Sequence, residues 1–376
     1  MAKKALLTLG GTYHKVKKGY LTLDGVYRKV KKAYLTIGGA YRPCFGGGEL
    51  DYYGTAENMN TRRSAVTGAS VGDYALFAGG YSTGPATYHT TVNAYNSSLV
   101  QSMPTGLSLG RRYMKSASVG KYALFGGGYT DNTTDVVDAY DSSLTRTTPS
   151  ALSQRRYQHA AATVGDYALF GGGQWGSSIY ATVDAYDSAL TRTTPTALSA
   201  ARYKLAGASN GSYALFGGGD TGFVMNDVDA YNSSLTRTIP APFSSGIYNL
   251  SGASVGDYAL FGGGTTGSAS HLGIDVYAYD SSLTRIIPTV LSAKRIDPAT
   301  TSVGNYALFG GGGNGTGGST NTVDAYDVAL TRTTPPPMSK SKMSFAAATA
   351  GKYALFSGGS TNATSTTDVV DVYTVD

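Results

Sequence analysis

Residues 122–128 read YALFGGG, and the same seven letters recur from Tyr167, Tyr213, Tyr258 and Tyr306. Two variants, YALFAGG from Tyr74 and YALFSGG from Tyr353, bring the number of copies to seven. A short apolar run that ends in glycines is typical of a buried strand followed by a turn. The sequence therefore predicts seven copies of the same strand.

The spacing of these copies indicates the kind of repeat. They begin 46.5 residues apart on average, because 279 residues separate the first from the last. This period fits a β-propeller and is too long for leucine-rich or ankyrin repeats. The composition agrees, since 51 glycines, 30 tyrosines and only two glutamates, Glu49 and Glu57, favour short strands over helices. We expect an all-β protein.

Each repeat reads as four strands separated by turn residues. In the third repeat the strands are expected at 159–164, 167–172, 182–187 and 190–194. The first strand of every repeat consists of small residues, such as AAATV and SGASV. Small side chains suit the innermost strand of a wedge-shaped blade, where seven sheets crowd around one axis. The sequence predicts a seven-bladed propeller with four-stranded blades.

The repeat resembles the kelch motif. Each copy has an apolar YALF strand ending in Gly-Gly, followed by a strand of the V-D-A-Y-D type. Eleven positions before the Tyr of YALF stands a basic residue, which only the fifth copy replaces, with Ile247. The basic residues are Arg63, Arg111, Arg156, Arg202, Arg295 and Lys342. The chain departs from the motif by lacking the Trp of the fourth strand, where it has L-T-R-T-T-P. The resemblance covers residues 50–376 and implies the propeller fold, whereas kelch propellers include binding modules and a few enzymes.

The two ends of the chain are expected to meet in one blade. The last repeat stops after its third strand, at residues 369–375, and residues 50–54 stand at the spacing of a fourth strand before Arg62. Pairing of these segments would close the ring and remove an exposed sheet edge.

Charge separates a head from the propeller. Residues 1–45 contain ten Lys and Arg against one acid, Asp24, so their net charge is +9, while the whole chain carries +6 and the remainder −3. We predict a basic head at 1–46 and a propeller domain at 47–376.

The head carries a second, shorter repeat. ALLTLGGTYHKVKK, GYLTLDGVYRKVKK and AYLTIGGAYRPCF each read as a β-hairpin. They are similar to short hairpin repeats at the ends of tail-associated proteins in phages of Gram-positive bacteria. This resemblance implies a phage tail fibre or receptor-binding protein, with the head as the attachment or oligomerisation element for other tail or baseplate proteins.

Three interpretations of the basic residues of the head remain open. The lysines can form the solvated polar face of small hairpins, bind an acidic partner surface, or bind nucleic acid with aromatic side chains stacked on the bases. The tyrosines in question are Tyr13, Tyr20, Tyr27, Tyr34 and Tyr41. No recognised nucleic-acid module accompanies them, so we do not expect a nucleic-acid partner.

No targeting or membrane segment is expected. The apolar run at 5–9 is too short for a secretory signal, and no stretch approaches the roughly 18 apolar residues of a membrane helix. We therefore expect no membrane insertion. The phage interpretation implies synthesis in the host cytoplasm, a place in the virion tail, and an extracellular location after release.

The variable surface follows from loop lengths. From the third-strand Tyr to the next YALF Tyr the count is 27 in all six cases, whereas the count within a blade varies from 18 to 21. All length variation thus lies between strands two and three. Because strands alternate in direction, this loop shares a face with the loop from strand four to the next blade. We call this the loop face and expect only tight turns opposite it.

Aromatic residues beside Ser, Gly and Asn on the loop face are typical of adaptable binding surfaces. They suit sugar rings as well as protein epitopes, although individual side chains can serve loop packing instead. Trp175 is the strongest single candidate. The full set of candidate ligand-binding residues is Trp175, Tyr129, Tyr81, Tyr88, His89, Tyr180, Phe223, Met225, His271, Tyr113, Tyr157 and Tyr203.

Regularly repeated residues are expected to be scaffold. The tyrosines of YALF and of the third strand recur at fixed positions, as do the fourth-strand arginines, which we expect to form pairs along the outer part of the blades. These arginines are Arg146, Arg192, Arg237, Arg285 and Arg332.

Catalysis and metal binding find little support in the sequence. His14, His89, His159 and His271 lack paired metal-ligand spacing, and Cys44 is the only cysteine. The glycines at 310–318 precede a strand rather than the helix of a phosphate-binding loop. Asp131 and Asp135 could contact a cation but lack EF-hand spacing. We expect no cofactor and no metal.

The sequence thus predicts a non-enzymatic recognition module that binds a host-surface glycan or protein. Mounting several copies together would add avidity, so we expect a homo-oligomer, and specifically a trimer. Two alternatives stay open. One is a carbohydrate-active enzyme, which would need acidic and basic groups converging at the axis, and the other is a purely structural virion or baseplate component.

Overall fold

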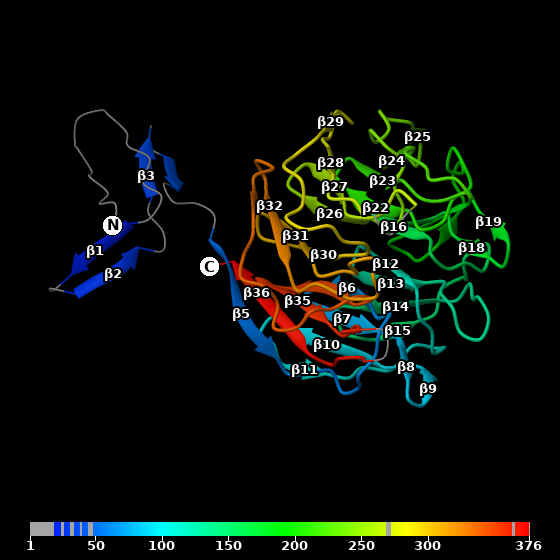
Figure 1. Ribbon diagram of the computed structural model, residues 1–376, viewed down its shortest axis with the longest axis horizontal. Helices are drawn as coiled ribbons and strands as arrows, with labels where there is room; N and C mark the ends of the chain where they lie inside the picture. The colour runs from blue at the N-terminus through cyan, green and yellow to red at the C-terminus, as the bar shows by residue number, and fades with distance from the viewer. Residues whose placement is uncertain are drawn as a thin grey trace. The chain divides into compact units, whose positions relative to one another are not determined.

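The computed structural model describes residues 48–267, 272–362 and 365–375 with their side chains, and the backbone of four strands within residues 19–43. The chain divides into two compact units, residues 1–50 with 375–376, and Asp51–Thr374. All regular elements of the described residues are β-strands (Figure 1). No helix among them is long and apolar enough to cross a membrane.

Seven four-stranded antiparallel sheets form a ring around a central axis, with the small-residue strands innermost (Figure 1). The predicted seven-bladed β-propeller is therefore confirmed. We number the blades along the chain, and the strands of the first three are as follows. Blade one contains β6 (Thr67–Val71), β7 (Tyr74–Ala78), β10 (Val92–Asn96) and β11 (Gln101–Ser102); blade two contains β12 (Lys115–Val119), β13 (Tyr122–Gly126), β14 (Val137–Asp141) and β15 (Arg146–Thr147); blade three contains β16 (Ala160–Val164), β17 (Tyr167–Gly171), β20 (Val183–Asp187) and β21 (Arg192–Thr193).

The other four blades repeat this order. Blade four contains β22 (Ala206–Ser209), β23 (Tyr213–Gly217), β24 (Val228–Asn232) and β25 (Arg237–Thr238); blade five contains β26 (Ser251–Val255), β27 (Tyr258–Gly262), β28 (Val276–Tyr279) and β29 (Arg285–Ile286); blade six contains β30 (Ala299–Val303), β31 (Tyr306–Gly310), β32 (Val323–Asp327) and β33 (Arg332–Thr333); blade seven contains β34 (Ala346–Ala350), β35 (Tyr353–Ser357), β36 (Val370–Val375) and β5 (Leu50–Ala56).

Four shorter strands form two hairpins within loops. They are β8 (Tyr81–Thr83) with β9 (Ala86–Tyr88), and β18 (Gln174–Trp175) with β19 (Ser178–Ile179). Both lie between the second and third strands of their blades, where the sequence places its length variation.

The unit at the start of the chain contains two hairpins. They pair β1 (Gly19–Leu23) with β2 (Val26–Val30), and β3 (Tyr34–Ile37) with β4 (Ala40–Pro43). These are the second and third hairpins predicted from the basic repeats. The first predicted hairpin, at 5–18, lies outside the described residues.

The strand that follows the head, β5, closes the ring, as predicted. β5 lies beside β36 and supplies the fourth strand of blade seven (Figure 1). The Tyr52 hydroxyl donates a 2.9 Å hydrogen bond to Asp371, and its ring contacts Tyr373 with centroids 5.3 Å apart. The ring of sheets consequently has no open blade at which the chain ends could separate.

The apolar YALF strand is explained by burial on both faces of each sheet. Leu76 of blade one packs in the same cluster as Ala123 and Phe125 of blade two. Phe77 instead packs toward blade seven, with Leu355. Successive residues of this strand therefore face opposite neighbours, so none of the four positions after Tyr can be polar without cost.

The glycines after this strand allow adjacent blades to touch through their main chains. The N–H of Gly128 donates a 2.9 Å hydrogen bond to the carbonyl oxygen of Arg156 in the next blade. A Cβ atom at Gly127, whose φ is +63°, would lie only 2.5 Å from that oxygen. The same bond joins every blade to the next and closes the ring from Gly359 to Arg63, and its other members are Gly80–Arg111, Gly173–Arg202, Gly219–Ile247, Gly264–Arg295 and Gly312–Lys342.

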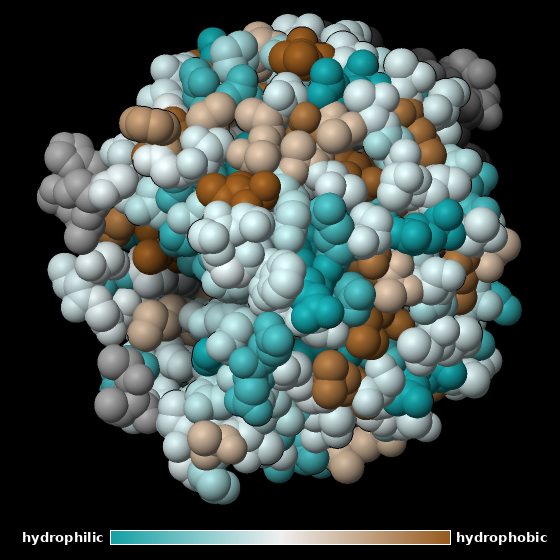
Figure 2. Space-filling view, turned by 90° about the vertical axis from the view of Figure 1, so that its right-hand side faces the viewer, coloured by the Kyte–Doolittle hydropathy of each residue, from teal (hydrophilic) through white to brown (hydrophobic). Residues whose placement is uncertain are grey.

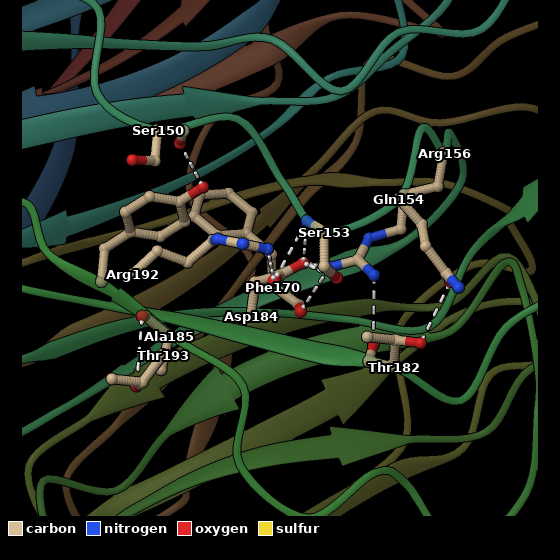
Figure 3. Close-up of polar contacts among 11 residues, drawn as sticks. Ser150, Ser153, Gln154, Arg156, Phe170, Thr182, Asp184, Ala185, Arg192 and Thr193 are labelled. Atoms are coloured by element: carbon tan, nitrogen blue, oxygen red, sulfur yellow. Dashed lines mark hydrogen bonds and ion pairs between the residues drawn. The ribbon is translucent and has the colours of Figure 1, made fainter.

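The side chain of the repeated basic residue is fully buried inside its own blade. In blade three, Arg156 binds the carboxylate of Asp184 at 2.6 Å and the carbonyl oxygen of Phe170 at 2.9 Å (Figure 3). Arg192 of the fourth strand binds the other oxygen of Asp184 at 3.0 Å. The third-strand aspartate thus lies between two arginines. The buried pair recurs as Arg111–Asp138, Arg202–Asp229, Arg295–Asp324 and Lys342–Asp371.

The pairing predicted for the fourth-strand arginines is observed for four of the five, whereas Arg285 of blade five donates to the carbonyl oxygen of Pro242 because Tyr277 stands in place of the aspartate. Arg332 binds Asp324 at 2.9 Å, while Arg146 and Arg237 lie 3.8 and 3.7 Å from their aspartates. The third-strand tyrosines are buried, and their hydroxyls donate to backbone carbonyls, as from Tyr186 to Ser150. Both sets are scaffold.

Two blades replace the ion pair in a coordinated way. In blade one the partner of Arg63 is Asn93, whose amide oxygen lies 2.7 Å from the guanidinium. In blade five both partners are apolar or aromatic, because Ile247 and Tyr277 occupy the two positions and pack in one cluster. The fold therefore accepts a hydrophobic substitute when both partners change together.

We predict that Asp184→Ala lowers the free energy of unfolding by about 3–5 kcal/mol, because it leaves Arg156 charged and buried without a carboxylate. The double variant Arg156→Ile, Asp184→Tyr copies blade five and should recover most of this loss. Urea unfolding followed by circular dichroism measures both. A double variant as unstable as Asp184→Ala would contradict this account.

Candidate functional site

The loop face is built by tying together two kinds of loop in each blade. An isolated antiparallel bridge joins the loop before the first strand to the loop after the second, as between Arg112 and Tyr129 or Tyr157 and Gln174. One such bridge is present in every blade, the others being Ser64–Tyr81, Tyr203–Asp220, Tyr248–Thr265, Ile296–Gly313 and Met343–Ser360. The two loop classes therefore share one face, as predicted, and their backbones are fixed against each other.

Five of the candidate tyrosines gather on blades one to three. Their rings form a continuous series of contacts in which Tyr81 meets Tyr88, Tyr88 meets Tyr129, Tyr129 meets Tyr157 and Tyr157 meets Tyr113, with centroid separations of 5.1 to 6.5 Å. We call these five residues the tyrosine cluster.

Figure 2 shows the side of the molecule on which β18 and β19 lie in Figure 1. On this side small groups of hydrophobic residues alternate with hydrophilic ones.

A single cation lies among these rings. The guanidinium carbon of Arg112 is 4.5 Å from the ring centroid of Tyr81 and 4.9 Å from that of Tyr113. Tyr129 and Tyr88 follow at 5.6 and 5.7 Å. Within the described residues Arg112 forms no ion pair, and its buried Nε has no hydrogen-bond acceptor. The guanidinium of Arg112 therefore makes cation–π contacts with four of the five rings.

The Tyr88 hydroxyl is a neutral hydrogen-bonding group, because burial raises its pKa above the usual value of 10, although Arg112 opposes this shift. The cluster consequently offers aromatic faces together with phenol hydroxyls that can donate and accept hydrogen bonds.

The remaining candidates lie apart from the cluster. Trp175 is 42% exposed and stacks against Arg155, whose guanidinium carbon is 4.9 Å from its ring. Among the described residues it makes no ring contact with the tyrosine cluster. Phe223 is 82% exposed, whereas Met225 and Tyr180 are half-buried.

Three further candidates differ in their contacts. His89 pairs with the Ser82 hydroxyl at 3.0 Å, and burial lowers the pKa of its imidazole. Tyr203 donates to Asp220 at 3.2 Å, and burial and that carboxylate raise its pKa. His271 lies outside the described residues.

A hollow at the propeller axis, on the loop-face side, is a site that the sequence analysis missed. It has a volume of about 190 Å³. Its lining includes, from every blade, the residue two positions after the repeated basic residue or, in blade five, after Ile247, namely Ala65, Tyr113, Gln158, Lys204, Asn249, Asp297 and Ser344. We call it the axial hollow. Tyr113 belongs both to it and to the tyrosine cluster.

Charged groups face one another across this hollow. Lys115, Lys204 and Asp297 all line it, yet no two of them lie within ion-pair distance of 4.0 Å in the described structure. Lys204 lies over the rings of Tyr203 and Tyr248, at 4.8 and 4.9 Å. The carboxylate of Asp297 is accessible to solvent but enclosed by protein, and this enclosure raises its pKa to about 6 although Lys115 and Lys204 oppose the shift.

The sequence did contain a signal for the axial hollow. The seven residues two positions after the basic residue are all different, although they stand beside nearly invariant strands. Such variation within a repeat indicates positions that each blade adapts separately. Their convergence on the axis follows only from the closed ring.

The hollow also contains a buried histidine. His159 is fully buried, and neither ring nitrogen has a hydrogen-bond partner in the described residues. Burial, followed by the charges of Arg156 and Lys115, lowers its pKa well below 6.5. The imidazole is therefore neutral in the fold and occupies a position that Leu205 and Leu250 fill in blades four and five.

No three His, Cys, Asp or Glu side chains within the described ranges are grouped so as to hold a metal ion.

Comparison with known proteins supports the fold. No protein-family model matches the chain, and no curated protein matches it. Among solved structures, the one titled "Structure of YjhT" superposes with a TM-score of 0.58 over 75% of this chain and 99% of that one, at 14% sequence identity. That likeness concerns the fold alone. The kelch and phage resemblances remain predictions.

We predict that His159→Leu stabilises the protein increasingly as the pH falls below 6.5. The folded imidazole stays neutral there, whereas the unfolded one takes up a proton, so wild-type stability is lost on acidification. The difference in unfolding free energy between variant and wild type should grow by up to about 1.4 kcal/mol for each pH unit. Urea unfolding at pH 7.5, 6 and 5 measures it, and a difference that stays constant with pH would refute the assignment.

Proposed function

We propose that the protein is a non-enzymatic recognition module whose loop face binds a host-surface glycan or protein. The observation that carries this proposal is the tyrosine cluster around Arg112. Four rings lie within 5.7 Å of one guanidinium that has no carboxylate partner among the described residues. A purely structural arginine in this protein, such as Arg156, is instead buried and paired with an aspartate.

The chemistry of the cluster favours a hydroxyl-rich ligand. Tyrosine presents a large rigid ring at a small entropic cost and keeps a polar hydroxyl at its edge. The C–H faces of sugar rings pack on such aromatics while their hydroxyls bond to the neighbouring polar groups. Trp175 with Arg155 and the exposed Phe223 extend the same kind of surface over blades three and four.

We further propose that the module works as a phage tail fibre or receptor-binding protein. This finer proposal is supported by the basic hairpin repeats at the start of the chain, two of which are described as hairpins. Under it the head attaches to other tail or baseplate proteins, and the chain acts as a homo-oligomer, with a trimer preferred because several loop faces then engage one cell surface.

One observation favours a second candidate, a carbohydrate-active enzyme. Such an enzyme requires acidic and basic groups near the axis, and Asp297 with Lys115 and Lys204 meets this requirement. The pKa of about 6 at Asp297 lies in the range of a general acid or base. Release of reducing ends from host polysaccharide, abolished in Asp297→Asn, would assign this class.

We predict that Tyr129→Ala and Arg112→Ala each weaken binding to host cells or to the best glycan-array ligand by about tenfold or more, because both disrupt the same set of contacts. Tyr53→Ala, at a tyrosine that is 56% exposed on β5, is the matched control and should leave binding unchanged. Equal binding by the wild type, Tyr129→Ala and Arg112→Ala would exclude the cluster as the site.

A further inference from the structure

The charges of the axial hollow come from alternate blades. Lys115 begins β12 of blade two, Lys204 precedes β22 of blade four, and Asp297 precedes β30 of blade six. These positions are far apart in the sequence and meet only because the ring closes. The three side chains therefore point from different sides into one volume of about 190 Å³.

The seven lining residues that come one from each blade form the rim of the axial hollow, and hydrogen bonds hold their backbone rigidly. The N–H of Lys204 donates to Gln158 O at 2.8 Å, that of Asn249 to Lys204 O at 3.0 Å, and that of Asp297 to Asn249 O at 2.8 Å. The rim residues also share a left-handed backbone, with φ of 55° at Lys204 and 47° at Asp297. This conformation is uncommon for residues other than glycine. A hydrogen-bonded rim thus fixes where each side chain starts.

The cations are not satisfied within the protein. Among the described residues the ammonium of Lys115 has neither an ion pair nor a hydrogen bond, and Lys204 contacts only the faces of Tyr203 and Tyr248. An ammonium group carries three N–H donors and no acceptor. Lys115 is exposed to solvent within the hollow and Lys204 is half-buried, so an anion that enters from solvent can reach both ammonium groups.

Packing of the scaffold does not require these residues. The equivalents of Lys115 in the other blades are small, namely Thr67, Ala160, Ala206, Ser251, Ala299 and Ala346. At the position of Lys204, blade five carries Asn249 and blade seven carries Ser344. Lysine at both places is consequently an addition that a blade of this protein does not need in order to fold.

We propose that the axial hollow binds an oxyanion, a carboxylate or a phosphate group, through the ammonium groups of Lys115 and Lys204, and that protonation of Asp297 strengthens this binding. The inference does not rest on the proposed function of the loop face. The neutral lining groups of Asn249, Gln158 and Tyr113 supply further hydrogen bonds to such a ligand.

The pH dependence follows from the charges that face Asp297. With Asp297 ionised, the two lysines and this carboxylate leave a net charge of +1, and with Asp297 protonated the hollow carries +2. The neighbouring His159 does not add charge over this range, because burial holds its pKa well below 6.5 and the imidazole stays neutral. An anion should therefore bind more tightly at pH 5 than at pH 8.

The test is a titration of the full-length protein by isothermal calorimetry. Sulfate serves for the pH series, because its charge is constant between pH 5 and 8, while acetate and inorganic phosphate at pH 7 distinguish a carboxylate from a phosphate source. We expect one saturable site per chain, with sulfate affinity rising about tenfold from pH 8 to pH 5. Absence of saturable binding of all three anions would overturn the proposal.

The variants are copied from the protein's own blades so that they fold. Lys115→Thr copies blade one and Lys204→Asn copies blade five, and each should weaken sulfate binding by about tenfold or more. Asp297→Asn, also a copy of blade five, should bind at pH 8 as tightly as the wild type does at pH 5 and lose the pH dependence. This gain in affinity cannot arise from misfolding.

A matched control distinguishes a specific anion site from nonspecific electrostatic attraction of sulfate to the protein. Lys121 lies in the turn between β12 and β13, at the other end of the first strand from Lys115, and is exposed. Lys121→Met removes the same charge and should leave sulfate binding unchanged; an equal loss in Lys121→Met and Lys115→Thr would contradict a specific site. Tyr129→Ala should retain sulfate binding, so failure of the glycan test and failure of this one remain distinguishable.

Discussion

The close approach of each Gly-Gly pair to the next blade is the contact on which the ring depends. Gly128 donates its N–H to the carbonyl oxygen of Arg156, and a side chain at Gly127 would collide with that same oxygen. The guanidinium of Arg156 meanwhile binds Asp184 and the second strand of its own blade. One residue thus joins two blades through its main chain and holds one blade together through its side chain. Because these two functions are separate, blade five can replace the ion pair by Ile247 and Tyr277 and still keep the bond between blades.

Because the main chain and the side chain of Arg156 have separate functions, the two residues that follow Arg156, and its equivalent in each other blade, are free to differ. They follow a carbonyl group whose position is fixed, so their backbones are held by hydrogen bonds whatever side chain they carry. The first of them includes Arg112 and Tyr157, which contribute to the tyrosine cluster, and the second includes Lys204 and Asp297, which line the axial hollow. Binding groups on rigid elements lose little freedom when a ligand arrives. The repetition of the scaffold is therefore what permits the loop face to vary without loss of precision.

The sequence predicted the fold far better than the site, and the reason is repetition. Because the strand pattern occurs seven times, each copy can be checked against the other six. The predicted blade number, closing strand and loop face therefore all agree with the structure. Strand ends were less accurate, since the fourth strand of blade three spans Arg192–Thr193 rather than five residues. The tyrosine cluster was found as separate candidates, but the central place of Arg112 depends on contacts between blades. The axial hollow was missed because Lys115 occupies a strand position that reads as scaffold, and because left-handed Lys204 and Asp297 are not expected from any propensity.

The two proposed sites would use different physical effects and are nevertheless contiguous. The tyrosine cluster presents aromatic faces, so binding there would grow with the area that a ligand covers. The axial hollow places charged groups around a volume of about 190 Å³, so it would discriminate by size and by charge over a few atoms. Tyr113 contacts Tyr157 in the cluster and also lines the hollow. A chain-like ligand that lies across the tyrosines and ends in an acidic group can satisfy both sites at once, whereas neutral ligands would use the cluster alone. Affinity for an extended surface polymer and selection of its acidic terminus would then reside in neighbouring residues of the same rigid rim.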